Sequence, residues 1–237
     1  MNYYETKKLY YGKYLYKLVI YNTLAPIFRS ELQRKGDLSF ARQQLDRLHA
    51  DYENNIPLKR TIFRADVPVS KVDFFDAQEV YNQLKTKTDQ VCVRIGTYRN
   101  LVLYSNNKQL LCNLMSQVAT DEVDFWQPAS ENVDFLCNNK HIVIVDNKPA
   151  YNIRVILGKK RGADGLATWL ANNKDKSKVG NITYQALQEQ TYVNGLYFYV
   201  RDEKVLQLIT LICGDNIRKI ERLVWHEEID KYKYGNE

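Results

Sequence analysis

The sequence has few of the features that mark secreted, membrane-spanning or metal-binding proteins. Its 4 cysteines are widely spaced and form no CxxC pair, which argues against a zinc site and against a disulfide framework. No run approaches the ~20 apolar residues that a membrane span requires. The first residues, MNYYETKKLYY, have no apolar core of a signal peptide. We therefore expect a cytoplasmic protein with free thiols and no membrane contact.

Catalytic motifs are also scarce. His226 begins the stretch HEEID, which lacks the second histidine of HExxH, and no GxSxG, Walker A or GxGxxG pattern is present. One pattern is compatible with catalysis: Asp134, the apolar run HIVIV, then Asp146 and Lys148 could bind Mg²⁺ and activate water. The same Asp-Asn-Lys-Pro segment is typical of a turn between strands. We expect no enzyme activity and no cofactor, and keep a Mg²⁺-dependent nuclease as a lesser alternative.

The composition is that of a globular and basic protein. With 45% hydrophobic residues, the 237-residue chain can bury a core of ordinary size. The net charge of +6 favours anionic partners such as nucleic acid, although many basic proteins have no such partner. The 18 tyrosines suit half-buried strands and binding faces. The abundance of Lys, Asn and Tyr fits an AT-rich genome, such as that of a virus or phage.

A strand–helix–strand pattern occurs twice in the chain, at residues 101–126 and 196–225. In the second copy, apolar residues alternate along the first strand, Asp202 is placed to cap the helix, and Gly214 to end it. In the first copy Asn107 takes the place of the cap, 95 positions earlier. Either an internal duplication or the general form of a capped helix between two strands explains the similarity.

The order of strands and helices, with a hairpin over residues 91–104, indicates an α+β fold. The spacing fits split βαβ units, so we predict two tandem ferredoxin-like units with antiparallel sheets covered by helices. A polar stretch separates the predicted domains, an N-terminal one at 1–127 and a C-terminal one with a basic loop at 133–237. Helix caps are predicted at Asp164 and Thr183, and an exposed connection over 172–178.

The alternation of side chains predicts a binding face on the strand that begins the second copy. Tyr197, Tyr199 and Arg201 share one side of this strand. In sheet-based RNA-binding proteins, exposed aromatic rings stack on unpaired bases. Alternatively, the two tyrosines cover a layer of another subunit or domain. Tyrosines also alternate with lysines near the N-terminus, at Lys7, Lys8, Lys13 and Lys17. This alternation suits an edge strand or a groove that follows a nucleic-acid backbone.

A cationic loop, GKKRGADG at 158–165, provides the second candidate contact. Lys159, Lys160 and Arg161 can neutralise phosphates, and the glycines allow backbone amides to approach an anion near a helix start. A solvated basic loop is the alternative. Arg94 and Arg154 are predicted as further phosphate contacts.

The leading hypothesis from the sequence is a non-enzymatic protein that binds single-stranded or structured RNA or DNA. The alternative is a structural or interaction module that self-associates or docks on a protein partner through its tyrosine-rich faces. No motif of a known family is recognised in the chain.

Overall fold

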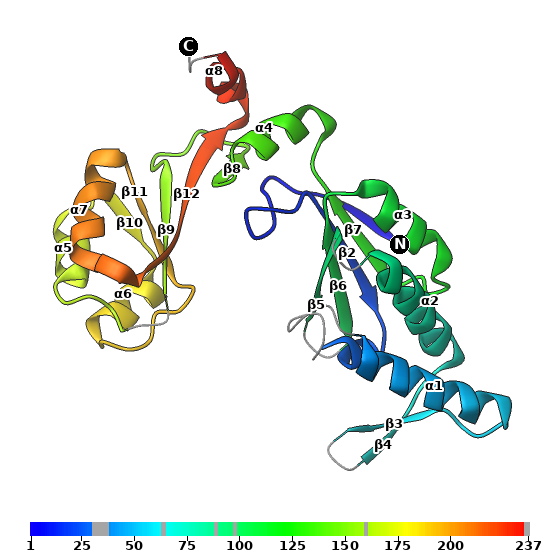
Figure 1. The fold of residues 1–237 in the computed structure, drawn as a ribbon. Coiled ribbons are helices and arrows are strands. Elements are labelled where there is room, and N and C mark those ends of the chain that lie inside the picture. Colours follow the sequence, from blue (N-terminus) through cyan, green and yellow to red (C-terminus); the bar gives the residue numbers. More distant parts are fainter. Residues whose placement is uncertain (30–37, 63–64, 88–89, 97–98, 159–160, 235–237) are drawn as a thin grey trace. The chain divides into compact units, whose positions relative to one another are not determined.

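The computed structural model shows two compact units, each built on its own sheet (Figure 1). The first unit comprises Met1–Thr6 and Tyr10–Val133, and the second comprises Lys7–Leu9 and Asp134–Glu237. The short segment Lys7–Leu9 joins the second unit through its backbone, because the amide of Ile144 donates to the Lys7 carbonyl at 2.8 Å. The structure describes residues 1–29, 38–62, 65–87, 90–96, 99–158 and 161–234.

The sheet of the first unit has five strands in the order β1-β7-β2-β6-β5. Its central strand β2 is antiparallel to both neighbours, so β6 and β7 are parallel to each other, and α3 (Lys108–Gln117) connects them. The alternation of β2 turns Leu18 and Ile20, both 0% exposed, into the core under the helices. The strands are β1 Asn2–Glu5, β2 Tyr16–Tyr21, β5 Val91–Ile95, β6 Asn100–Ser105 and β7 Val123–Gln127.

Three longer helices complete the first unit. In α1, Ala41, Leu45 and Leu48 recur at helical spacing and enter the same core as the strand residues. As predicted, Asn107 caps α3, since its side chain accepts from the amide of Leu110 at 3.0 Å. In Figure 1, α2 and α3 lie on one face of the sheet. The bounds are α1 Ser39–Glu53, α2 Lys71–Lys87 and α3 Lys108–Gln117.

The sheet of the second unit also has five strands, in the order β10-β11-β9-β12-β8. Strand β9 is antiparallel to β11 and to β12, and α7 connects these two strands. Helices α5 (Leu166–Asn172), α6 (Asn181–Gln188) and α7 lie on one face of this sheet (Figure 1). On this face Val155, Phe198 and Ile209 form part of a separate core. The bounds are β8 Ile142–Val145, β9 Ile153–Leu157, β10 Ser177–Val179, β11 Tyr197–Val200, α7 Glu203–Cys213 and β12 Ile217–Trp225.

The two sheets share one strand order when the first is read from β1 and the second from β8. In each sheet the first neighbouring pair is parallel and the other three pairs are antiparallel. The connections differ. Between β2 and β5 the first unit has η1 (Ala25–Phe28), α1, the hairpin of β3 (Lys59–Ile62) and β4 (Ala65–Pro68), and α2. The second unit has α5 (Leu166–Asn172) between β9 and β10, and α6 (Asn181–Gln188) between β10 and β11.

Several local predictions are wrong. Helix α5 begins after Gly165 at φ 76°, so Asp164 is not its cap, and Thr183 lies inside α6, which follows Gly180. The connection predicted to be exposed over 172–178 is exposed at Asn172, Lys174, Asp175 and Lys178, but its last two residues belong to β10, a strand of three residues. Strand β2, which carries Lys17, is the central strand of its sheet and not an edge strand.

The α+β class, with two five-stranded sheets made largely of antiparallel pairs, is confirmed. Each sheet is followed by a short helix, α4 (Val133–Asn138) after β7 and α8 (Ile229–Tyr234) after β12. Within the described ranges, none of the helices has both the length and the apolar character needed to cross a membrane. Independent folding of the predicted domains stays a prediction.

Candidate nucleic-acid interface

One face of the second sheet packs on helices, and the other face carries tyrosines and cations. Along β11, Phe198 and Val200 are 0% exposed on the helix side, so Tyr197 and Tyr199 point to the opposite side. We call this opposite side the tyrosine face. The pairing register assigns to it Lys178, Tyr197, Tyr199, Arg154, Lys219 and Glu221, from four neighbouring strands.

The two tyrosines of this face form an edge-to-face pair. Their ring centroids are 5.6 Å apart with an interplanar angle of 80°. Tyr197 is 44% exposed. Such a pair is held in place by its own contact and still presents ring surface to solvent. Because every base has a π-face, an exposed ring of this kind can stack on any unpaired base.

A buried carboxylate fixes the cations beside the tyrosines. Glu221 is 2% exposed and accepts from Arg154 Nε at 2.7 Å and from Lys219 Nζ at 2.7 Å. Burial by itself raises the pKa of Glu221, but the hydrogen bonds from Lys219 and Arg154 outweigh it, and the pKa is lowered. The triad therefore keeps a net charge of +1, and Arg154 lies 5.6 Å from the ring centroid of Tyr197.

For Arg154, burial opposes the charged form, yet hydrogen bonding and attraction to Glu221 raise its pKa above the ordinary value. An arginine held in this way has fewer donors to offer a phosphate than an unpaired one. Arg154 is therefore better suited to positioning the neighbouring rings than to binding phosphate alone.

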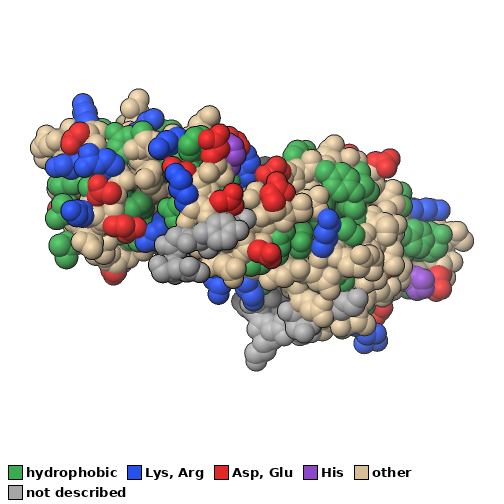
Figure 2. Space-filling model, turned by 90° about the horizontal axis from the view of Figure 1, so that it is seen from above, with side chains coloured by type: hydrophobic (Ala, Val, Ile, Leu, Met, Phe, Trp, Pro, Cys, Tyr) green, Lys and Arg blue, Asp and Glu red, His purple; other side chains and the backbone are tan. Residues whose placement is uncertain are grey.

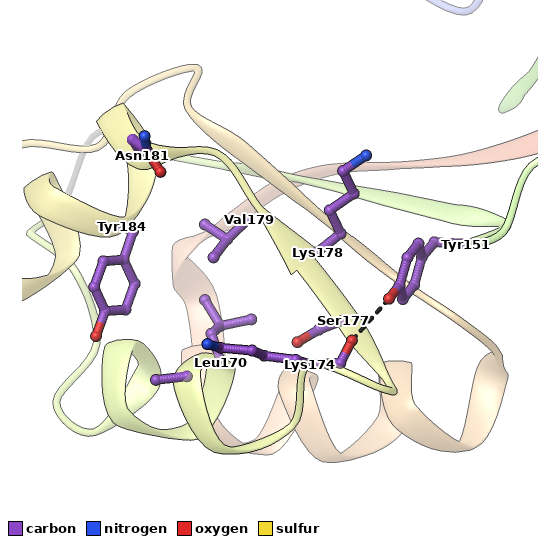
Figure 3. Close-up of a pocket in the computed structure, with 9 residues that line it drawn as sticks. Tyr151, Leu170, Lys174, Ser177, Lys178, Val179, Asn181 and Tyr184 are labelled. Carbon is purple, nitrogen blue, oxygen red and sulfur yellow. Dashed lines mark hydrogen bonds between the residues drawn. The ribbon is translucent and has the colours of Figure 1, made fainter.

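The edge strand β10 brings further lysines to the same sheet. Lys178 is paired with Tyr199 across the strands. A pocket of about 400 Å³ lies beside β10, between α5 and α6, with Leu170 and Val179 among its wall residues. Figure 3 shows that Lys178 points away from Leu170, and that the Tyr151 hydroxyl donates to the Lys174 carbonyl, at 2.7 Å. Lys178 is thus a cation at the rim of the tyrosine face.

Two predicted site residues lie at opposite ends of the sheet. Arg161 follows β9 and Arg201 directly follows β11, and these strands are antiparallel. Arg161 forms a bridge with Tyr192, and its carbonyl accepts from Asn216 Nδ2 at 2.8 Å. Arg201 forms an ion pair with Asp202 at 3.1 Å. The two arginines are therefore separated by the length of the strands.

The other predicted residues are not brought to this face. Arg94 is on β5 in the first unit, where its guanidinium lies 5.5 Å from the Tyr11 ring centroid. Lys159 and Lys160 lie outside the described residues. The backbone amide of Gly158, which precedes them, donates to the Asn216 carbonyl at 2.7 Å. This amide is therefore engaged within the protein and does not face an anion.

The positive charge of the chain is concentrated in the second unit. This unit has 18 Lys and Arg against 13 Asp and Glu, whereas the first unit has 16 against 15. In the view of Figure 2, the Lys and Arg side chains over the second unit alternate with Asp and Glu. A binding hypothesis therefore depends on the local arrangement of the tyrosine face and not on a broad basic surface.

Two residues of the nuclease alternative, Asp146 and Lys148, take part in ion pairs with other groups. Asp146 pairs with Lys7, which lowers the pKa of Asp146 through hydrogen bonding and charge. Lys148 lies 3.6 Å from Glu228, and Asp134 is in α4. The described part of the chain holds no group of three or more His, Cys, Asp or Glu side chains placed to bind a metal ion.

Sequence reasoning missed Lys178 and Lys219 as members of the face. Lys178 lies on a strand of only three residues, too short for an alternation pattern to be read. Lys219 lies in a longer strand, and its position beside Glu221 at i, i+2 was a readable signal for a shared face.

No family model, curated protein or solved structure matches the chain.

Proposed function

We propose that the second unit binds single-stranded segments of RNA or DNA on its tyrosine face, without catalysing a reaction. One observation carries the proposal: adjacent tyrosine rings and several cations share the side of the sheet opposite its helices, in the more basic unit. Stacking on rings and neutralisation of phosphates are the two contributions that single-strand binding without base readout requires.

The proposal gives each residue a role. Tyr197 and Tyr199 stack on bases and Lys178 meets phosphates. Arg154 and Lys219, both held by Glu221, keep positive charge beside the rings. Arg161 and Arg201, with Lys159 and Lys160, extend the phosphate contacts toward the two ends of the sheet. Arg94 belongs to the other unit, and it contributes only if the nucleic acid also contacts the first sheet.

Fluorescence anisotropy with a 5′-hydroxyl, end-labelled oligonucleotide tests the proposal. We expect the full chain to bind single-stranded RNA or DNA at low salt, with affinity that falls as salt increases. Tyr197→Ala should weaken binding by about five- to a hundredfold, because stacking contributes roughly 1–3 kcal/mol per base.

Tyr232→Ala is the matched control, since Tyr232 is a 46% exposed tyrosine of the same unit on α8. It should leave the affinity unchanged. Absence of binding by the wild type at low salt, or equal weakening by both variants, would refute the proposal.

We further propose that both units are ferredoxin-like and arose by internal duplication. The shared strand order supports this, as do the equivalent caps: Asp202 accepts from the amide of Val205 at 3.0 Å, as Asn107 does in α3. In both units a strand with a Trp near its end precedes a short helix.

A graft of one helix into the other unit tests the duplication. Residues 202–213 replace 107–118, so that Val205, Leu206 and Ile209 take the buried positions of Leu110, Leu111 and Leu114. We expect the chimera to unfold cooperatively with a native-like circular dichroism spectrum. A chimera in which the first unit is unfolded would contradict structural equivalence of the helices.

A second candidate function is the interaction module, which one observation favours. Leu208 and Leu211 on α7 are 51% and 82% exposed, so this helix presents apolar side chains to solvent. If they mediate self-association, light scattering should show an oligomer that Leu211→Gln converts to monomer. A monomeric wild type at all concentrations would exclude self-association through this helix.

A further inference from the structure

A cavity of about 850 Å³ opens in the first unit beside the hairpin of β3 and β4. Its wall includes Arg29 after η1, Arg47 on α1 and Arg60 on β3. Among the described residues that line it, none is a carboxylate. Three guanidinium groups from three separate segments therefore border one space of the size that small-molecule sites have.

Arg60 is the most constrained of the three. Its Nε–H is buried and has no hydrogen-bond acceptor in the described part of the chain. Burial, and then the positive charge of Arg99, lower the pKa of Arg60, while Asp73 opposes this shift. A buried donor without an acceptor and a neighbouring like charge are both unfavourable, and a bound anion relieves both.

Arg47 is held so that its guanidinium remains at the cavity. Its Nη2 donates to the Lys59 carbonyl at 3.0 Å, which ties α1 to β3. A guanidinium has five N–H donors, so this one bond leaves others for a ligand. Arg29 precedes α1 in the sequence, whereas Arg60 follows it, and Arg29 is exposed.

The rest of the wall is partly apolar. Phe40 is 43% exposed, and Ile27 and Ile95 also line the cavity. Apolar and aromatic side chains beside convergent charged groups suit a ligand that has a flat apolar part and an anionic part.

We propose that this cavity binds a nucleotide, with its phosphates at Arg29, Arg47 and Arg60 and its base against Phe40 and Ile95. Arginine forks match phosphate oxygens in bidentate geometry, and several arginines suit a group with more than one negative charge. The chemistry is the same for a free nucleotide and for the 5′-phosphate end of a strand. The site does not depend on the tyrosine face, which belongs to the other unit.

Titration of the full chain with mant-labelled ATP measures the proposed binding, with adenosine, tripolyphosphate and inorganic phosphate as competitors. We expect ATP to compete best, tripolyphosphate to compete more weakly, and adenosine to compete at least about tenfold more weakly, because charge-assisted hydrogen bonds supply most of the affinity. If 5′-phosphorylated oligonucleotides compete and 5′-hydroxyl ones do not, the ligand is the 5′-phosphate end of a strand. If ATP competes and neither oligonucleotide does, the ligand is a free nucleotide.

Arg47→Gln and Arg42→Gln form the decisive pair. Both remove one positive charge from α1, but Arg42 is paired with Asp46 at 3.5 Å and does not line the cavity. Arg47→Gln should weaken ATP binding about tenfold or more, and Arg42→Gln by less than about twofold. Arg60→Gln should act like Arg47→Gln; where it unfolds the unit by circular dichroism, Arg60→Lys replaces it.

Equal effects of Arg47→Gln and Arg42→Gln, or no ATP binding by the wild type at low salt, would overturn the proposal. Competition by tripolyphosphate as strong as that by ATP, with no effect of Phe40→Ala, would overturn the contact with the base. Tyr197→Ala should leave ATP binding unchanged, so failure of this site and failure of the tyrosine face are distinguishable.

Discussion

In both units the central strand carries a cation opposite a tyrosine of the next strand. Lys17 is paired with Tyr104 in the first sheet, and Arg154 with Tyr199 in the second. Tyr104 and Tyr199 are 95 positions apart, the same separation as the two helix caps. The two faces can therefore be compared residue by residue.

In the first unit this face is covered by the chain itself. Tyr10, Tyr11 and Tyr14 surround Tyr104, with ring centroids 5.3, 5.1 and 6.3 Å away. Burial, and then a hydrogen bond with Tyr11, raise the pKa of Tyr104 well above its ordinary value. Lys17 lies over the Trp126 ring at 3.2 Å from its centroid, and burial lowers the pKa of Lys17.

In the second unit the equivalent tyrosine pairs only with Tyr197 among the described ring contacts, and the cation pairs with a carboxylate. The difference originates in the connection before the central strand. In the first unit this connection turns at Tyr11 and Gly12, both at positive φ, and returns its tyrosines to the sheet. One strand order thus gives a covered face in one unit and a partly exposed face in the other.

The largest expected effect is the loss of stability when a buried ring is removed from one of the two cores. Phe198→Ala removes a ring that is 0% exposed in the second core, and should lower the free energy of unfolding of that unit by about 3–5 kcal/mol. Hydrogen exchange measures the effect in each sheet separately. Phe125→Ala is the counterpart in the first core. Equal losses in both sheets from either variant would show that the units unfold as one.

The next effect distinguishes the covered tyrosine from the exposed pair. Tyr104→Ala should destabilise the first unit by about 2–3 kcal/mol, because it removes a ring that packs on three others, and leave oligonucleotide binding unchanged. Tyr199→Ala should do the reverse, weakening binding by roughly 1–3 kcal/mol with a smaller loss of stability. Anisotropy titration and chemical denaturation of both variants give the comparison. Loss of binding in Tyr104→Ala would mean that the first face also binds.

A smaller effect concerns the carboxylate that holds both cations of the second face. Glu221→Gln leaves Arg154 and Lys219 without their counter-charge, and should cost about 2 kcal/mol of stability at pH 7. Because the folded pKa of Glu221 is below its ordinary value of 4.5, its contribution is present above pH 4.5 and is lost as pH falls through the folded pKa. The difference between wild type and variant should therefore shrink in acid.

Glu203→Gln is the control for that pH dependence. Glu203 is 55% exposed and pairs with Arg222 at 2.8 Å, so its loss should cost about 0–1 kcal/mol. Denaturation from pH 7 to pH 3 checks both variants. A pH-independent cost for Glu221→Gln would mean that the loss is one of packing and not of charge.

Local signals in the sequence predicted the elements better than the sites. The caps at Asn107 and Asp202 and the faces of β11 could be read because each depends on neighbours within a few residues. The pairing of Arg154 with Glu221 joins residues 67 positions apart and follows from the register of two strands. No local pattern encodes such a register.

The cavity of the first unit is a stronger example of the same limit. Its arginines come from a turn, a helix and a strand, and none of the three segments has an unusual charge pattern. In the opposite direction, the run of cations at 159–161 was conspicuous in sequence, but Arg161 lies at one end of the sheet, away from Arg201. Clustering in sequence and clustering in space are different properties.

The smallest expected effect compares the two helix caps, which are equivalent in place but not in chemistry. Asn107→Ala should destabilise the first unit by about 1 kcal/mol at any pH, because the amide oxygen that accepts from Leu110 does not titrate. Asp202→Ala should destabilise the second unit at neutral pH. The hydrogen bond from the amide of Val205, and then that from Arg201, lower the pKa of Asp202, so its contribution fades as pH falls through the folded pKa. Hydrogen exchange in α3 and α7 across acid pH measures both, and an equal pH response of the two caps would contradict this assignment.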